Sequence, residues 1–190
     1  MTQNKTVLAW IKEMADMCQP DQQVWIDGSE EQLEALRAEA VATGEMIKLN
    51  EEKLPGCYYH RTAPNDVARV EDRTFICTET EEEAGPINNW MEPAKMYAKL
   101  NALYEGSMKG RTMYIIPYSM GPVGSPFSKI GIELTDSIYV VLNMAIMTRV
   151  GKAVMDRLGN ADDAEFVKCL HAKKDVDPEE RYIVQFPQDN

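Results

Sequence analysis

The segment from residue 61 to residue 73 gathers charged side chains of both signs in a stretch without helical or strand periodicity. Its charged members are Arg61, Asp66, Arg69, Glu71, Asp72 and Arg73. An arginine guanidinium presents a planar fork of N–H donors that matches a carboxylate, and an adjacent carboxylate can aim that fork. The segment is therefore a candidate carboxylate-binding loop. The simpler interpretation, which the pattern alone favours, is a solvated loop of surface ion pairs.

Nucleotide phosphates have no evident binding loop in this sequence. A phosphate-binding loop of the G-x-x-x-x-G-K-[ST] type needs a glycine five residues before its Gly-Lys pair, and Gly151-Lys152 lacks both that glycine and the following Ser or Thr. The turn from Gly121 to Gly124 has no lysine, and its neighbouring prolines remove backbone donors. We therefore interpret this turn as structural.

Nucleophilic and metal chemistry are equally poorly supported. No G-x-S-x-G elbow or Ser-His-Asp signature is present, and His60 and His171 have no motif around them. The four cysteines lie far apart without a C-x-x-C pair, so we expect reduced thiols and no metal site made by this chain alone. They are Cys18, Cys57, Cys77 and Cys169.

Composition and charge restrict the class of protein. The chain has 190 residues, 44% of them apolar and 27% charged, which predicts one folded domain with a sizeable core. The net charge of −11 opposes binding to nucleic acid, because a phosphate polyanion is held by clustered Lys and Arg. No apolar run reaches the ~20 residues of a membrane span, and the N-terminal residues show no targeting pattern. We therefore expect a cytoplasmic protein with no nucleic-acid or membrane partner.

Helical and strand patterns alternate along the chain and predict an α/β fold, a mixed sheet flanked by helices. Ser29 and Gln32 have the spacing of a capping box, and Gly44 suits the end of that helix. The acidic run at residues 79–83 is interpreted as a solvated linker. The predicted helices cover residues 5–18, 29–44, 93–106, 138–147 and 154–159. The predicted strands cover residues 24–26, 46–49, 57–59, 74–78, 113–117, 130–134, 165–171 and 181–186.

Two of these elements carry more specific expectations. The helix at residues 138–147 is apolar on nearly every side, so it is predicted to be buried. The strand at 181–186 is followed by the turn residues Pro187 to Asn190, which predicts the first half of a hairpin. An unpaired strand edge there would allow a dimer of the chain.

Several of these segments, taken together, resemble the GTP-dependent phosphoenolpyruvate carboxykinases. The resemblance covers essentially the whole chain and is weakest before residue 20 and at residues 79–92. The matching segments are DVARVE (66–71), MKGRTMY (108–114), SMGP (119–122), GSP (124–126), KIGIELTDS (129–137), MTR (147–149) and FVKCLH (166–171).

The resemblance implies an activity and two site residues. Enzymes of this family decarboxylate oxaloacetate on Mn²⁺, and the enolate takes the γ-phosphoryl group of GTP, bound with Mg²⁺, to give phosphoenolpyruvate, GDP and CO₂, a reaction of gluconeogenesis. Arg69 matches the arginine that binds the carboxylate of oxaloacetate or phosphoenolpyruvate. Glu71 matches a glutamate of the same mobile loop that contacts the lid over the site. The family is typically monomeric.

The sequence departs from the family in what it lacks. The resemblance implies that the metal ligands, the phosphate-binding loop with its reactive cysteine and the guanine pocket lie beyond residue 190. Residues 1–190 are thus expected to form the N-terminal, substrate-side domain, without the C-terminal nucleotide- and metal-binding domain. Such a domain should bind no metal or nucleotide and should not turn over alone, since phosphoryl transfer depends on positioning and charge stabilisation. The alternative is a self-contained module that binds a carboxylate or a partner without catalysis.

Overall fold

The structure, a computed structural model, describes residues 2–62, 64, 70–161 and 164–189. The helices are α1 (Lys5–Cys18), α2 (Glu30–Ala42), α3 (Glu81–Ala84), α4 (Pro93–Tyr104), α5 (Ile138–Met147) and α6 (Lys152–Leu158), with the 3-10 turns η1 (Glu71–Arg73) and η2 (Pro178–Glu180). The strands are β1 (Gln22–Trp25), β2 (Ile47–Lys48), β3 (Tyr58–Tyr59), β4 (Thr74–Ile76), β5 (Thr112–Met120), β6 (Lys129–Thr135), β7 (Arg149–Val150), β8 (Val167–His171) and β9 (Ile183–Gln185). The predicted α/β class is confirmed.

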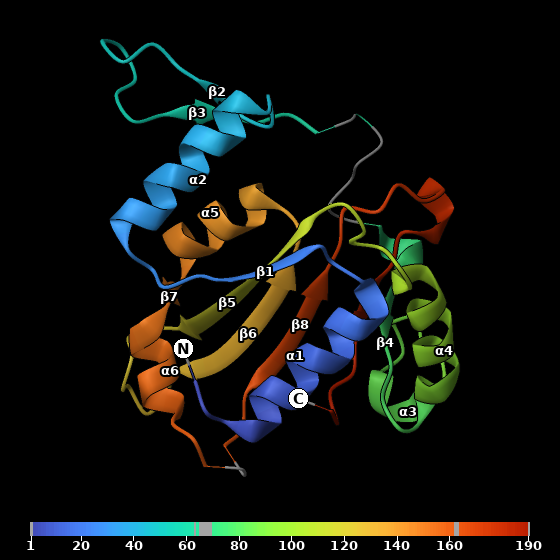
Figure 1. The fold of residues 1–190 in the computed structure, drawn as a ribbon. Coiled ribbons are helices and arrows are strands. Elements are labelled where there is room, and N and C mark those ends of the chain that lie inside the picture. The colour runs from blue at the N-terminus through green and yellow to red at the C-terminus, as the bar shows by residue number, and fades with distance from the viewer. Residues whose placement is uncertain (1, 63, 65–69, 162–163, 190) are drawn as a thin grey trace.

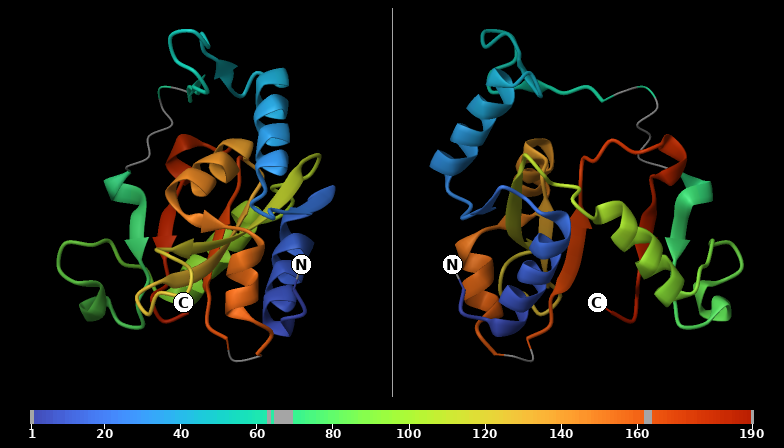
Figure 2. Two further views of the ribbon diagram at one scale, coloured as in Figure 1. Left: turned by 90° about the vertical axis from the view of Figure 1, so that its left-hand side faces the viewer. Right: turned by 45° about the vertical axis from the view of Figure 1, so that its right-hand side comes forward.

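A mixed sheet of five strands organises the molecule (Figure 1). Its order is β1-β5-β6-β8, and β7 pairs with the far end of β5. β1 runs parallel to β5, β5 and β6 form the long antiparallel pair, and β8 runs parallel to β6. The hairpin of β2 and β3 stands away from this sheet at the end of α2, and β4 with β9 forms a separate pair (Figures 1 and 2).

Two apolar clusters cover opposite faces of the sheet, because alternate residues of each strand point to opposite sides. On one face, α1 and α6 pack on side chains such as Met113, Ile115 and Leu134. On the other face, α2 and α5 pack on Tyr114 and Ile116. The sheet is therefore the middle layer of three.

Local signals place two of the helices where the sequence predicts them. Asn4 caps α1, its Oδ1 accepting from Val7 N at 3.0 Å, and α1 spans the predicted residues. The Ser29 hydroxyl caps α2 as predicted, accepting from Gln32 N at 3.2 Å. The Gln32 side chain does not complete the box, however, because it reaches back past Ser29 to Asp27 N and to Trp25 O, each at 2.8 Å. Gln32 thus fastens the start of α2 to the end of β1.

Two expectations about surface exposure are wrong in part. The acidic run is not a linker throughout, because residues 81–84 form the short helix α3, begun by Thr80 N donating to Glu83 at 3.2 Å. α5 has its predicted bounds but is not buried all round: Ile138, Val141 and Leu142 are buried, whereas Ile146 and Met147 at its end are 78% and 66% exposed. The predicted strand near the C-terminus is β9, which pairs in parallel with β4.

Gly151 shows why the Gly-Lys pair is structural. Gly151 has φ +99°, and a Cβ on it would lie 2.0 Å from the carbonyl oxygen of Asp27. At this close approach Lys152 N donates to that same carbonyl at 3.1 Å. The β7–α6 turn and the β1–α2 turn are therefore in main-chain contact, which only glycine permits.

A buried ion pair joins three segments at one end of the sheet. The Asp136 side chain has no exposed surface and accepts from Arg111 Nε at 2.6 Å and from Lys173 N at 2.8 Å. The Arg111 guanidinium also donates to the Ser107 carbonyl. Because Asp136 follows β6, Arg111 precedes β5 and Lys173 follows β8, this carboxylate ties the ends of all three strands together.

We expect Asp136→Ala to lower the free energy of unfolding by about 3 kcal/mol, since it removes the acceptor of both donors from a buried position. Urea denaturation followed by circular dichroism measures the change. Asp156→Ala is the matched control. Asp156 is 61% exposed and pairs with Lys152, so its loss should cost about 0.5 kcal/mol or less. Equal effects of the two variants would contradict the central role of Asp136.

Candidate functional site

The charged segment predicted to bind a carboxylate is described only in part. Arg69 and Asp66 lie outside the described residues. Glu71, Asp72 and Arg73 form the 3-10 turn η1, so the prediction of an irregular loop up to residue 73 is wrong for its last three residues. The turn leads directly into β4, which makes β4 the element that positions this end of the segment.

The described charges in η1 are arranged close together at the surface. Glu71 and Asp72 are exposed, and Asp72 pairs with Arg73 at 3.4 Å. Arg73 is more enclosed, with a 23% exposed side chain whose buried Nε has no hydrogen-bond partner among the described residues. The local turn is closed by Arg73 N donating to Val70 O at 3.1 Å and by the Thr74 hydroxyl donating to the same carbonyl at 2.7 Å. Glu71 is thus presented to solvent from a hydrogen-bonded turn.

An asparagine that the sequence analysis did not single out reaches this turn. The Asn89 side-chain amide donates to the carbonyls of Glu71 at 2.6 Å and of Thr74 at 3.0 Å. The main chain of Asn89 also bridges to β4, where Ile76 N donates to its carbonyl at 3.0 Å. The only sequence signal is the run Asn88-Asn89-Trp90, inside the stretch where the family resemblance is weakest. No spacing rule connects it to residues 15 to 18 positions earlier.

A second polar cluster lies in the central sheet, on the face that α5 covers in part. The Tyr118 hydroxyl and the Cys169 thiol are 3.3 Å apart, and Glu133 lies opposite Cys169 in the β6–β8 pair. Tyr118 occupies the space beside Gly131, where a Cβ would meet its ring at 2.4 Å. Burial raises the pKa of the Glu133 carboxyl to about 7 and raises the pKa of the Cys169 thiol. Cys169 is therefore held as a thiol at neutral pH, which disfavours a nucleophilic role.

The cysteines and histidines form no donor set among the described residues. In the described part of the chain the four cysteines are free, and no group of three or more His, Cys, Asp and Glu side chains is placed to hold a metal ion. His60 stacks on Tyr139 with ring centroids 4.0 Å apart, and its Nδ1 lies 2.6 Å from Glu45 O. His171 Nδ1 lies 2.9 Å from the Thr135 hydroxyl. Both histidines thus have contacts within the fold.

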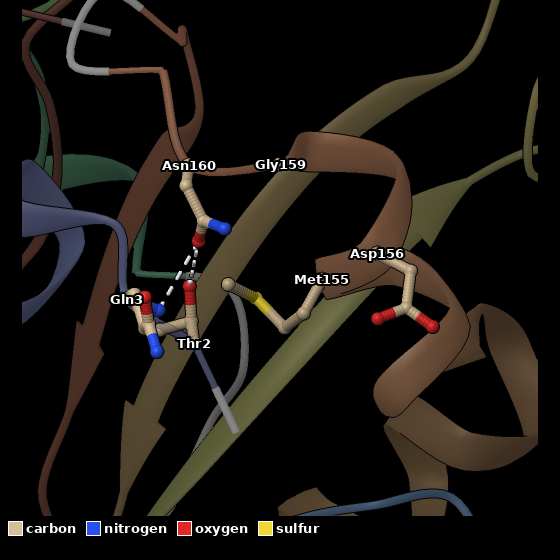
Figure 3. Close-up of a pocket in the computed structure, with 6 residues that line it drawn as sticks. All are labelled: Thr2, Gln3, Met155, Asp156, Gly159 and Asn160. Atoms are coloured by element: carbon tan, nitrogen blue, oxygen red, sulfur yellow. Dashed lines mark hydrogen bonds between the residues drawn. The ribbon is translucent and has the colours of Figure 1, made fainter.

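Two surface hollows lie outside the charged segment. The hollow in Figure 3, of about 630 Å³, is lined by Thr2, Gln3, Met155, Asp156, Gly159 and Asn160. Asn160 Oδ1 accepts there from Gln3 N at 3.1 Å, which anchors the N-terminal residues rather than presenting a reactive group. The other hollow, of about 720 Å³, lies between α2, the β2–β3 hairpin and α5. Its cations, Arg37 and Lys48, are paired with glutamates at 2.5 to 3.1 Å.

The structure defines an α/β domain in which the charged segment leads into β4, a three-residue strand with main-chain partners on both edges. Residues 9–190 match the family described as the phosphoenolpyruvate carboxykinase N-terminal domain. The chain belongs to this family.

Named relatives agree with this assignment along the whole chain. The phosphoenolpyruvate carboxykinase (GTP) of Anaeromyxobacter dehalogenans (strain 2CP-C) is 57% identical over 189 residues, which is 100% of this chain and 31% of the relative. Those of Corynebacterium kroppenstedtii and Neocallimastix frontalis are each 51% identical over 199 residues, covering 99% and 98% of the chain and 32% of each relative. The chain thus spans about a third of the length of these relatives.

None of the helices in the described part of the chain has both the length and the apolar composition of a membrane span.

We expect the stability of the domain to depend on pH through Glu133. Its folded-state pKa, about 7, lies above the ordinary value of 4.5, so folding favours the protonated carboxyl. Stability is therefore highest below about pH 4.5 with respect to this group, falls as the pH rises toward 7, and is level above that. Glu133→Gln removes the ionisation, so at pH 8 the variant should be more stable than the wild type by about 3 kcal/mol.

Urea denaturation at pH 5 and pH 8 measures this difference. At pH 5 the advantage of Glu133→Gln should be small, because the wild-type carboxyl is then largely protonated in the folded state. Glu165→Gln, at an exposed position just before β8, serves as the control, and its stability should match that of the wild type at both pH values. A Glu133→Gln variant that is less stable than the wild type at pH 8 would contradict the raised pKa of the Glu133 carboxyl in the folded state.

Proposed function

We propose that residues 1–190 are the N-terminal, substrate-side domain of a GTP-dependent phosphoenolpyruvate carboxykinase. In this reaction oxaloacetate and GTP give phosphoenolpyruvate, GDP and CO₂. The observation that carries the proposal is the 57% identity along the entire chain to an enzyme of that name. The nucleotide-binding and metal-binding domain would be supplied by sequence beyond this chain. We also place the protein in the cytoplasm.

Within the domain, we assign carboxylate binding to Arg69 and a contact with the closing lid to Glu71. The support for Arg69 is the match of residues 66–71 to the family segment, together with the bidentate fit of a guanidinium to a carboxylate. The support for Glu71 is its exposed position at the start of η1, two residues later in the chain. Binding at this segment would hold the substrate in one orientation while other groups act on it.

Manganese and magnesium belong to the proposed reaction of the full-length enzyme. The described residues offer no cluster of three or more of the side chains that bind such ions. No step of the reaction is therefore assigned to a metal held by this domain, and its residues are assigned binding and orientation only. A single arginine–carboxylate pair that is open to water contributes little affinity, so we propose a half-site that needs the second domain.

The isolated chain of 190 residues is expected to fold and to show no GTP-dependent loss of oxaloacetate. The test compares the purified chain with the full-length protein expressed from its own reading frame, using a coupled assay for phosphoenolpyruvate. Turnover by the isolated chain, free of full-length enzyme, would overturn the proposed half-site. A full-length protein without this activity would overturn the proposed function itself.

Arg69→Gln in the full-length protein is expected to lower kcat/KM for oxaloacetate roughly 100-fold, because a charge-assisted, two-pronged contact is lost. Arg61→Gln is the control from the same charged segment and should change kcat/KM less than twofold. Calorimetry of the isolated chain with an oxaloacetate analogue adds a second readout. Micromolar binding that is lost in Arg69→Gln would favour the alternative, a self-contained carboxylate-binding module.

A further inference from the structure

The outer side of α5 is an apolar stripe. It consists of Tyr139, Asn143, Ile146 and Met147, whose spacing of four, three and one residues places them along one side of the helix. Tyr139, Ile146 and Met147 are exposed. α5 contains no Asp, Glu, Lys or Arg, whereas every other helix in the described part of the chain contains at least two. A helix face that stays in water normally carries charged side chains, so this stripe indicates a surface that another apolar surface covers.

The amide on this stripe is already hydrogen-bonded within the helix. Asn143 Nδ2 donates to Tyr139 O at 2.8 Å. Removing a polar group from water costs much less when the group keeps a hydrogen-bond partner. The stripe can therefore pack against an apolar surface without stranding this donor.

The stripe also forms one wall of the larger hollow, of about 720 Å³. Tyr139, Leu142, Asn143 and Ile146 line the hollow from α5, and Met46 adds an apolar side chain from the segment between α2 and β2. The cations of α2 and the β2–β3 hairpin, on the other walls, are paired with glutamates. An apolar wall bordered by polar groups is typical of a protein–protein contact.

The apolar surface continues from the end of α5 to the end of β5. Figure 1 shows α5 leading into β7 beside the end of β5, and in that pair Arg149 lies opposite Ser119. Met147 precedes Arg149 by two residues and Met120 follows Ser119, so both methionines lie at this junction, and both are exposed. We call the following residues together the α5 surface: Met120, Tyr139, Asn143, Ile146 and Met147.

We propose that the α5 surface is the docking surface for the part of the full-length protein that follows residue 190, and this inference rests on the proposed function. The chain is matched to 31% of its relative from Anaeromyxobacter dehalogenans (strain 2CP-C), so about two thirds of that relative's length lies outside the match. Two domains that share one substrate must be held together, and apolar area removed from water stabilises such a contact. The covering surface should itself be apolar, because a charge placed against Ile146 would be buried without a partner.

Thiol labelling of the full-length protein, expressed from its own reading frame, tests whether the α5 surface is covered. Ile146→Cys introduces a small apolar side chain whose reaction with a maleimide reports access, and peptide mass spectrometry separates it from the native cysteines. Ala9→Cys is the matched control, because Ala9 is exposed on α1 in line with Lys5 and Glu13, on a face whose charges suit water. Each rate is divided by the rate of the same site in the denatured protein.

We expect position 146 to react about 10-fold more slowly than position 9. Equal rates would show that the α5 surface is open in the full-length protein and would overturn the proposal. Labelling is repeated after a dilution of about 100-fold, because contact with a second copy depends on concentration and contact within one chain does not. Protection that disappears on dilution would assign the surface to a second copy, which would equally overturn the proposal.

Ile146→Glu in the full-length protein gives a second measurement. It places an unpaired carboxylate against the covering surface, so we expect the midpoint of thermal unfolding to fall by about 5 °C. Ala9→Glu should shift the midpoint by about 1 °C or less, because its new side chain stays in water. A midpoint of Ile146→Glu equal to that of the wild type would contradict the docking surface.

The phosphoenolpyruvate assay, run on the same preparations, keeps this inference separate from the proposed function. An active protein in which position 146 reacts as fast as position 9 overturns the docking surface alone. An inactive protein in which position 146 is protected overturns the proposed function and leaves the docking surface in place.

Discussion

The fold depends on a single buried carboxylate. Asp136 is enclosed at the end of the central sheet, where Arg111 Nε and Lys173 N each donate to it within 2.8 Å. A charge in such a place is tolerated only when its lone pairs are occupied by donors, so three chain segments must meet there in one register. β5, β6 and β8 are thereby locked at their ends, and the helices that cover both faces are built on this arrangement.

The helices cover only part of one face of the central sheet. α2 and α5 cover Tyr114 and Ile116, but Glu133 and Cys169 are only partly covered further along that face. The end of α5 exposes Ile146 and Met147, although its sequence is among the most apolar in the chain. An apolar helix is thus buried only as far as its neighbours extend, which is why the pattern overestimated its burial.

Some residues of the candidate site could be predicted from the sequence, and others could not. The mixture of Arg and acidic residues indicated a carboxylate-binding loop, and the family resemblance singled out Arg69 and Glu71 from it. Arg69 lies outside the described residues, and Glu71 is exposed at the start of η1. Asn89 could not have been selected in this way. A lone amide that reaches carbonyls 15 and 18 residues earlier follows no helical or strand period, so only the folded chain reveals it.

Features that depend on neighbours along the chain could be predicted: the bounds of α1 and α5, the Ser29 cap and the α/β class all follow from local periodicity and capping. Tertiary structure alone decided the parallel pairing of β4 with β9, two strands of three residues each. It also decided the Asp136 junction and the contact of Gly151 with Asp27. Such short strands and single contacts gain their stability from partners far away in the sequence, and no local pattern names those partners.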